Sequence, residues 1–145
     1  MAVQVQVTFD AGDAEALGRF WVEVLDYVQQ PPPDGHPSWD AFLASVGVPP
    51  DAWHDAFAAI DPDGVGPRLL FQRVPEGKTA KNRVHLDVNV GAGHQAPHRA
   101  AVVRARAAEL VALGATLLRV FEGEEGPDSF WIVMADPEGN EFCLQ

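Results

Sequence analysis

The first 25 residues change from an alternating to a helical pattern of apolar positions. Residues 3–9 alternate strictly between apolar and polar side chains, which is typical of a β-strand with one buried face. From residue 14 to residue 25 the apolar positions recur at helical spacing, and Asp13 can cap this helix. We therefore expect a strand and then a helix. The strand residues expected to pack under the helix are Val3, Val5 and Val7, and the opposite face carries Gln4, Gln6 and Thr8.

The same order of elements returns in the second half of the chain. Residues 84–90 alternate again, with Val84, Leu86 and Val88 apolar, and residues 98–113 have helical spacing that ends at Gly114. Three strand-like segments follow each helix, at 27–30, 56–60 and 68–74 and then at 116–121, 130–135 and 140–145. The pattern therefore predicts a duplicated βαβββ arrangement of the α+β class, and not a doubly wound parallel sheet.

Residues 31–54 interrupt the first repeat. Three consecutive prolines, 31–33, stop any regular element, and Ser38 precedes a short amphipathic run over 39–46. We interpret the segment as an insertion whose aromatic side chains, Trp39, Phe42 and Trp53, pack over another part of the protein. A loop of this length often has a function, but a surface flap that only buries its own tryptophans fits the pattern equally well.

Charge and composition exclude several classes of protein. The 145 residues carry 21 acidic and 10 basic side chains, a net charge of -11, which disfavours binding to nucleic acid or to anionic membranes. A single cysteine allows no intramolecular disulfide and no paired-cysteine zinc site. Neither a signal peptide nor an apolar stretch of transmembrane length is visible, so we expect a cytoplasmic protein.

Four motifs carry a resemblance to a known family. They are Leu17–Trp21 with Val24–Leu25, Arg83–Val88, Glu109–Ala115 and Ala135–Phe142, the last being the most specific. With them the chain resembles the vicinal oxygen chelate superfamily, in particular its glyoxalase-like and bleomycin-resistance-like members. The resemblance implies one glyoxalase-like domain over 1–145, in which two βαβββ modules form a cup-shaped mixed sheet. The modules would span 1–75, with the insertion at 31–54, and 83–145, and such proteins are often homodimers.

The resemblance also identifies the positions that bind one divalent metal in metal-dependent relatives. In this chain they fall on Gln6, Gln72, His85 and Cys143, of which Cys143 stands where a glutamate is usual. Hard divalent cations favour carboxylates or several imidazoles, and two amides, one imidazole and one thiol are a poor set. Glu141 shares the strand face of Cys143 but lies two residues away from the expected position. We therefore expect no bound metal and no other cofactor.

His85, Asp87 and Cys143 are the residues with candidate chemistry. His85 is expected to face the cup, where it can serve as a general acid or base, although a hydrogen-bonded structural histidine fits as well. Asp87 shares its face and either orients His85 or is an exposed sheet residue. Cys143 is a candidate nucleophile, but a lone cysteine in an apolar strand is more often a packed side chain.

Five of the ten basic residues gather between positions 68 and 83. They are Arg68, Arg73, Lys78, Lys81 and Arg83. In an acidic protein this cluster can attract a carboxylate or a phosphate of a ligand, or it can be a solvated linker between the modules.

Three functional hypotheses follow. The first is a protein that binds a small aromatic or anionic molecule in the cup, with Trp39, Trp53 and Trp131 available for stacking. The second is a metal-independent lyase or isomerase with His85 as acid or base. The third, a metal-dependent glyoxalase or dioxygenase, is disfavoured by the ligand set. The predicted ligand-binding residues are Gln6, Gln72, His85, Asp87, Trp131, Glu141 and Cys143.

Overall fold

The computed structural model of the chain describes residues 3–123, 126 and 129–145. The chain divides into two compact units, an N-terminal unit, Met1–Gly77, and a C-terminal unit, Lys78–Gln145. None of the helices in the described part of the chain has the length and apolar character that crossing a bilayer requires.

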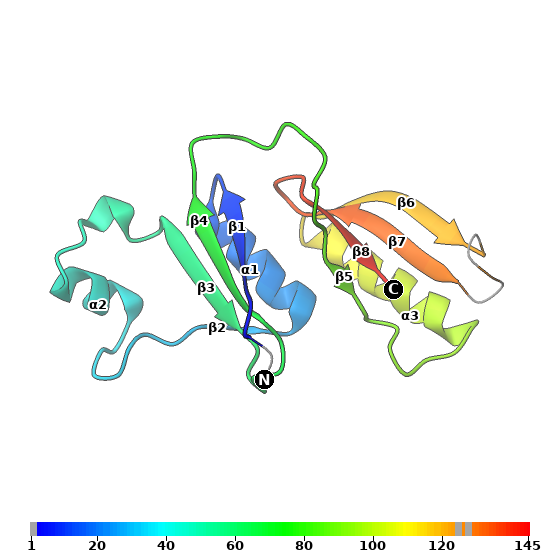
Figure 1. Cartoon of the computed structure of the whole chain (residues 1–145), viewed down its shortest axis with the longest axis horizontal. Coiled ribbons are helices and arrows are strands. Elements are labelled where there is room, and N and C mark those ends of the chain that lie inside the picture. Colours follow the sequence, from blue (N-terminus) through cyan, green and yellow to red (C-terminus); the bar gives the residue numbers. More distant parts are fainter. Residues whose placement is uncertain (1–2, 124–125, 127–128) are drawn as a thin grey trace. The chain divides into compact units, whose positions relative to one another are not determined.

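The N-terminal unit is a four-stranded mixed sheet with one long helix (Figure 1). The strand order is β1-β4-β3-β2, in which β1 and β4 are parallel and the other pairs are antiparallel. Its elements are β1 (Gln6–Ala11), α1 (Ala14–Leu25), β2 (Val28–Gln29), α2 (Trp39–Ser45), the 3-10 helix η1 (Pro50–Ala52), β3 (Ala56–Ile60) and β4 (Arg68–Arg73).

Local sequence explains both ends and the buried side of α1. The carboxylate of Asp13 accepts a hydrogen bond from the backbone N–H of Ala16 at 2.9 Å, as the sequence predicts. Leu17 and Trp21 are each 1% exposed, and burial of such a side chain stabilises the fold by about 2 kcal/mol. Gly18 lets the helix approach the sheet closely, because a Cβ there would lie 2.2 Å from the Phe57 ring.

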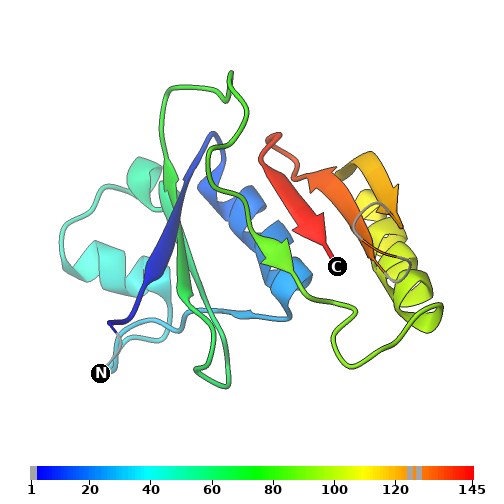
Figure 2. The same cartoon turned by 45° about the vertical axis from the view of Figure 1, so that its right-hand side comes forward.

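The two faces of this sheet have different coverings. Leu69 and Phe71 are fully buried on the face that packs against α1. Arg68 and Leu70 alternate with them and so lie on the opposite face, which we call the open face. In Figure 2 the sheet is seen nearly edge-on, with α1 on one side and the cyan segment that contains α2 on the other.

The C-terminal unit repeats this design. Its strand order is β5-β8-β7-β6, with β5 and β8 parallel and the other pairs antiparallel. On one face of the sheet α3 buries Val103 and Leu110 near Ile132 and Met134, and all four are at most 1% exposed. The elements are β5 (Asp87–Val88), α3 (His98–Ala112), β6 (Thr116–Glu122), β7 (Phe130–Ala135) and β8 (Glu141–Leu144).

Each unit therefore consists of a strand, a helix and three further strands, and in each the last strand lies beside the first. The predicted α+β class and the duplicated βαβββ arrangement are confirmed. The segment 31–54 is an insertion into the first repeat, between β2 and β3, and it contains α2 and η1.

Three apolar residues at the ends of the predicted strands are exposed, contrary to expectation. Val3 is 90% exposed, Val5 69% and Val84 79%. The reason for the first two is that β1 pairs only with β4, and β4 begins at Arg68, opposite Gln6. Among the residues that the structure describes, no strand pairs with residues 3–5, so their alternating pattern does not lead to burial. Val84 similarly precedes β5, which covers only Asp87–Val88.

Candidate functional site

A cavity of about 630 Å³ lies in the N-terminal unit, between the insertion and the open face of the sheet. The open face contributes Arg68 and Leu70 from β4 and Ala58 from β3, and Glu15 and Arg19 of α1 reach one side. The insertion contributes Trp39, Leu43 and Trp53. The wall is thus apolar over the tryptophans and charged over α1 and β4, as in many small-molecule sites.

Both tryptophans of the insertion are held by their indole N–H groups. Trp39 donates to the backbone carbonyl of Gln30 at 2.7 Å, and Trp53 donates to that of Val48 at 2.9 Å. Both side chains are half-buried and line the cavity. Their polar atoms are satisfied within the protein, so the rings offer apolar surface to the cavity. The insertion therefore forms a cavity wall, in addition to burying its own aromatic residues.

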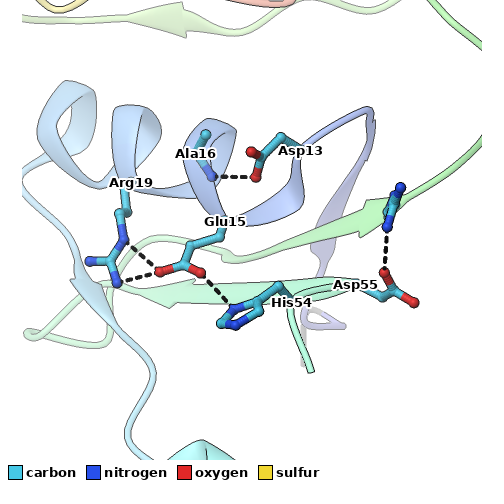
Figure 3. A network of polar contacts seen from close by, with 7 residues as sticks. Asp13, Glu15, Ala16, Arg19, His54 and Asp55 are labelled. Carbon is cyan, nitrogen blue, oxygen red and sulfur yellow. Dashed lines mark hydrogen bonds and ion pairs between the residues drawn. The ribbon is translucent and has the colours of Figure 1, made fainter. Parts of the chain in front are cut away.

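Glu15 joins α1 to the end of the insertion (Figure 3). One carboxylate oxygen accepts hydrogen bonds from Arg19, at 2.6 and 2.9 Å, and the other lies 2.7 Å from Nδ1 of His54. The Arg19 hydrogen bonds hold the pKa of Glu15 below its usual value. Asp55, the next residue of the wall, is paired with Arg73 at 3.3 Å. Most charges of this wall are thus paired with opposite charges.

The predicted residues Gln6 and Gln72 lie on the open face of the same sheet but outside the cavity lining. The side-chain oxygen of Gln6 accepts a hydrogen bond from Arg68. The amide of Gln72 donates to the carboxylate of Asp10 at 2.8 Å. Their role in ligand binding stays a prediction.

Three of the predicted residues come together on the C-terminal sheet, on the face away from α3. Nε2 of His85 lies 3.4 Å from the Asp87 carboxylate, and Asp87 faces Cys143 across the parallel pair of β5 and β8. Donor atoms of the three side chains all lie within 4.8 Å of one another. Burial, with Asp87 nearby, raises the pKa of the Cys143 thiol to about 11. The thiol is therefore protonated at neutral pH, which argues against the nucleophile hypothesis.

Glu141 and Trp131 have structural partners in the same unit. The carboxylate of Glu141 lies 3.0 Å from Nζ of Lys78 and accepts the backbone N–H of Asn82 at 3.0 Å. This N–H, together with the Lys78 ammonium, lowers the pKa of Glu141 to about 2. The ring of Trp131 stacks on Phe121 with centroids 4.7 Å apart. Neither residue is part of the cavity in the N-terminal unit.

Comparison with known proteins identifies the family. The profile of the "Glyoxalase-like domain" family matches residues 6–145, which covers both units. The chain belongs to the glyoxalase-like domain family. No curated protein matches its sequence.

Solved structures share the fold of this glyoxalase-like protein at low sequence identity. A glyoxalase/bleomycin resistance protein/dioxygenase family enzyme from Burkholderia phytofirmans PsJN is 16% identical, with a TM-score of 0.62 over 96% of this chain and 94% of that one. A glyoxalase-related enzyme from Fulvimarina pelagi is 19% identical, with a TM-score of 0.62 over 99% and 87%. At these identities the likeness shows the fold alone.

One structural neighbour contains a metal. It is a fosfomycin resistance protein mutant from Listeria monocytogenes, solved with Mn(II) and 1S,2S-dihydroxypropylphosphonic acid. It is 10% identical to the glyoxalase-like protein, with a TM-score of 0.63 over 100% of this chain and 90% of that one. The corresponding positions of this chain can therefore be tested for their fit to such an ion.

Strand registers identify the position in the first repeat that corresponds to Cys143. Gln6 and His85 are the metal-binding positions that the resemblance gives for the first strand of each repeat. Thr8 lies two residues after Gln6, and Asp87 lies two residues after His85. Thr8 pairs with Leu70, and Asp87 pairs with Cys143. By this comparison Leu70 is the counterpart of Cys143, and Gln72 lies two residues further along β4.

The residues at the family's metal-binding positions do not fit a hard divalent ion. By the resemblance they are Gln6, Gln72, His85 and Cys143, and the strand registers favour Leu70 over Gln72. Neither set contains a carboxylate, and Leu70 has no donor atom. The amide oxygen of Gln6 is already bonded to the guanidinium of Arg68, whose positive charge would oppose a cation there. Mn²⁺ and Mg²⁺ favour several oxygen ligands. The local set of His85, Asp87 and Cys143 suits Zn²⁺ better, but it offers only three ligand atoms, all from the C-terminal unit.

The sequence reasoning missed most of the cavity wall. Glu15 and His54 are far apart in the chain, and a histidine in a polar loop is usually only solvated, so no spacing rule could pair them. Gln30 likewise has no motif around it. The feature of the sequence that did indicate this wall was the long insertion with its tryptophans.

Proposed function

We propose that this glyoxalase-like protein binds a small organic molecule, with an aromatic part, in the cavity of the N-terminal unit. The observation that carries the proposal is the cavity of about 630 Å³ with Trp39 and Trp53 in its wall. Small-molecule sites typically have a volume of this order and combine apolar walls with a few polar groups. Because both indole N–H groups are already bonded, the rings can stack on a ligand without leaving a donor unsatisfied.

Metal-independent binding is part of the proposal. The metal-binding positions of the family lack carboxylates in this chain, and the cavity lining contains neither His85 nor Cys143. Stacking on tryptophan and hydrogen bonding to fixed side chains need no metal. We further propose that the two units act together as one glyoxalase-like domain over 1–145, since the family match spans both.

Fluorescence titration with the neutral bicyclic probe 2-naphthamide tests the proposal. We expect saturable binding that Trp39→Leu weakens by about tenfold, the equivalent of one lost stacking contact. Trp131→Leu is the matched control, because Trp131 stacks on Phe121 outside this cavity. Circular dichroism confirms that both variants fold. Equal weakening by both substitutions, or no saturable binding of 2-naphthamide and its carboxylate analogue 2-naphthoate, would refute the proposal.

A second candidate function is that of a metal-independent lyase or isomerase with His85 as acid or base. The contact of 3.4 Å between His85 and Asp87 favours it, because a carboxylate beside a histidine can orient the imidazole ring and select its tautomer. Both side chains are nearly half exposed and so accessible to a substrate. Turnover of small epoxides and aldehydes should vanish in His85→Ala, while binding in the N-terminal cavity should persist. Unchanged turnover would exclude His85.

The homodimer, which the family resemblance implies, and the cytoplasmic location, which rests on the absence of a recognisable signal peptide, both stay predictions. Light scattering of the purified protein measures the first directly, and a mass near 15.7 kDa would contradict it.

A further inference from the structure

Arg68 carries a charge without an acidic partner in the cavity wall. It is half-buried on the open face of the sheet, where it lines the cavity. Among the residues that the structure describes, its hydrogen-bond partners are two neutral amides. Nε donates to the side-chain oxygen of Gln30 at 2.6 Å, and Nη1 donates to that of Gln6.

The other bases of this wall are in a different situation. Arg19 is paired with Glu15 at 2.6 Å, and His54 contacts the same carboxylate at 2.7 Å. Asp55 is paired with Arg73, at 3.3 Å. Asp40 also lines the cavity, but it is exposed, so water screens its charge more than that of half-buried Arg68. Arg68 is therefore a half-buried positive charge in the cavity wall, and no acidic side chain of the described residues is in direct contact with it.

Gln30 fixes this charge relative to the aromatic wall. Its backbone N–H donates to Ala58 of β3 at 2.9 Å, which anchors it to the sheet. Its backbone carbonyl accepts the indole N–H of Trp39, and its side chain accepts Nε–H of Arg68. One anchored residue thus holds both the guanidinium and the indole ring, so their separation is set before any ligand arrives.

We propose that the ligand of this cavity is an aromatic carboxylate, whose carboxylate is received by Arg68 and whose ring stacks on Trp39. This inference rests on the proposed function. A guanidinium has five N–H donors, and two of those of Arg68 are used by Gln30 and Gln6. The remaining donors can bind a carboxylate, and such charge-assisted bonds are stronger than neutral ones. The anion would also supply the negative charge that Arg68 lacks.

The test compares two probes that share a ring system and differ in charge, 2-naphthoate and 2-naphthamide, on the full chain at low salt. We expect 2-naphthoate to bind about tenfold or more tightly than 2-naphthamide in the unmodified protein, the ratio expected for one charge-assisted hydrogen bond. Arg68→Gln should reduce 2-naphthoate affinity by about 10- to 100-fold and bring the two probes close together. Its effect on 2-naphthamide should stay within about threefold.

Arg83→Gln is the matched control. It removes the same charge from an exposed arginine outside the cavity and should leave the preference for 2-naphthoate intact. Gln30→Ala is a second test of the role of Arg68. It removes the hydrogen bond that positions the guanidinium but leaves its charge in place. It should reduce the preference for 2-naphthoate by less than Arg68→Gln does.

The outcomes separate the two proposals. If neither probe binds, the proposed function fails and this inference fails with it. If 2-naphthamide binds the unmodified protein as tightly as 2-naphthoate does, the cavity is confirmed and the carboxylate is refuted, whether or not any variant folds. If Arg68→Gln lowers the affinity for both probes equally, Arg68 has only a structural role through its hydrogen bonds to Gln6 and Gln30, and the proposed carboxylate contact is refuted.

Discussion

Arg68 and Glu141 occupy equivalent positions in the sheets of the two units, but their charges have different surroundings. Each is the first residue of the last strand of its sheet, on the face away from the long helix. Glu141 has Lys78 and the backbone N–H of Asn82 as partners, whereas Arg68 has two neutral amides. A charge with an opposite partner mainly stabilises the fold. A half-buried charge without one remains available to a ligand.

The insertion accounts for the rest of the difference between the units. Residues 31–54 place Trp39 and Trp53 opposite the open face of the N-terminal sheet, and this creates the cavity. The corresponding face of the C-terminal sheet carries His85, Asp87 and Cys143 instead. Two copies of one βαβββ design thus acquired different surfaces, because loops and single side chains change more easily than the packed core.

The largest effect is expected on the free energy of unfolding when a side chain is removed from the hydrophobic core of either unit. Phe71→Ala and Phe142→Ala remove fully buried rings from the last strand of each sheet. Each should lower the free energy of unfolding by about 3–5 kcal/mol, through lost burial and the cavity left behind. Urea unfolding followed by circular dichroism measures both. Val65→Ala and Val84→Ala, at 89% and 79% exposed sites, are the controls and should change it little. A loss below about 1 kcal/mol in one unit would show that its core is not built as described.

A smaller effect separates the charges of Glu141 and Arg68. The folded protein lowers the pKa of Glu141 to about 2 from 4.5, so its contribution is complete above about pH 4.5 and is lost as the pH falls through 2. Glu141→Gln should cost about 1–2 kcal/mol at pH 7, and the difference from the unmodified protein should fade between pH 4.5 and 2.

Arg68→Gln provides the comparison for that pH dependence. Arginine does not titrate in this range, so any stability difference should not follow the curve of Glu141→Gln. Urea unfolding at several pH values measures both variants. If the difference for Glu141→Gln is the same at pH 2 and at pH 7, its partners do not stabilise the carboxylate.

The smallest expected effect is that of metal removal. We expect EDTA to change 2-naphthoate affinity by less than twofold, and added Mn²⁺ to have no effect, because no described residue of the cavity wall belongs to the His85, Asp87 and Cys143 set. Fluorescence titration before and after dialysis against EDTA is sufficient. A large loss that Zn²⁺ or Mn²⁺ restores would connect the binding site to a metal and refute the metal-independent proposal.

Periodicity predicted the repeated elements well and their ends poorly. Alternation over 3–9 gave the correct face for Val7 and Phe9, but Val3 and Val5 are exposed because no strand of the described part of the chain pairs with them. The faces of His85, Asp87 and Cys143 also followed from alternation, and the structure brings these side chains together. A pattern along one strand states which residues share a face, but the partner strand determines how many of them are covered.

The α+β class, the duplicated βαβββ order, the insertion and the absence of a carboxylate at position 143 can all be read from the amino-acid sequence. These features are local or repeated, so spacing and residue type are enough to show them. Which charges have partners, in contrast, depends on the tertiary structure. Arg68 meets Gln30 across 38 residues and Gln6 across 62, and Trp39 joins them through the carbonyl of Gln30. Contacts at such separations depend on how strands and loops pack, and no periodicity along the chain encodes them.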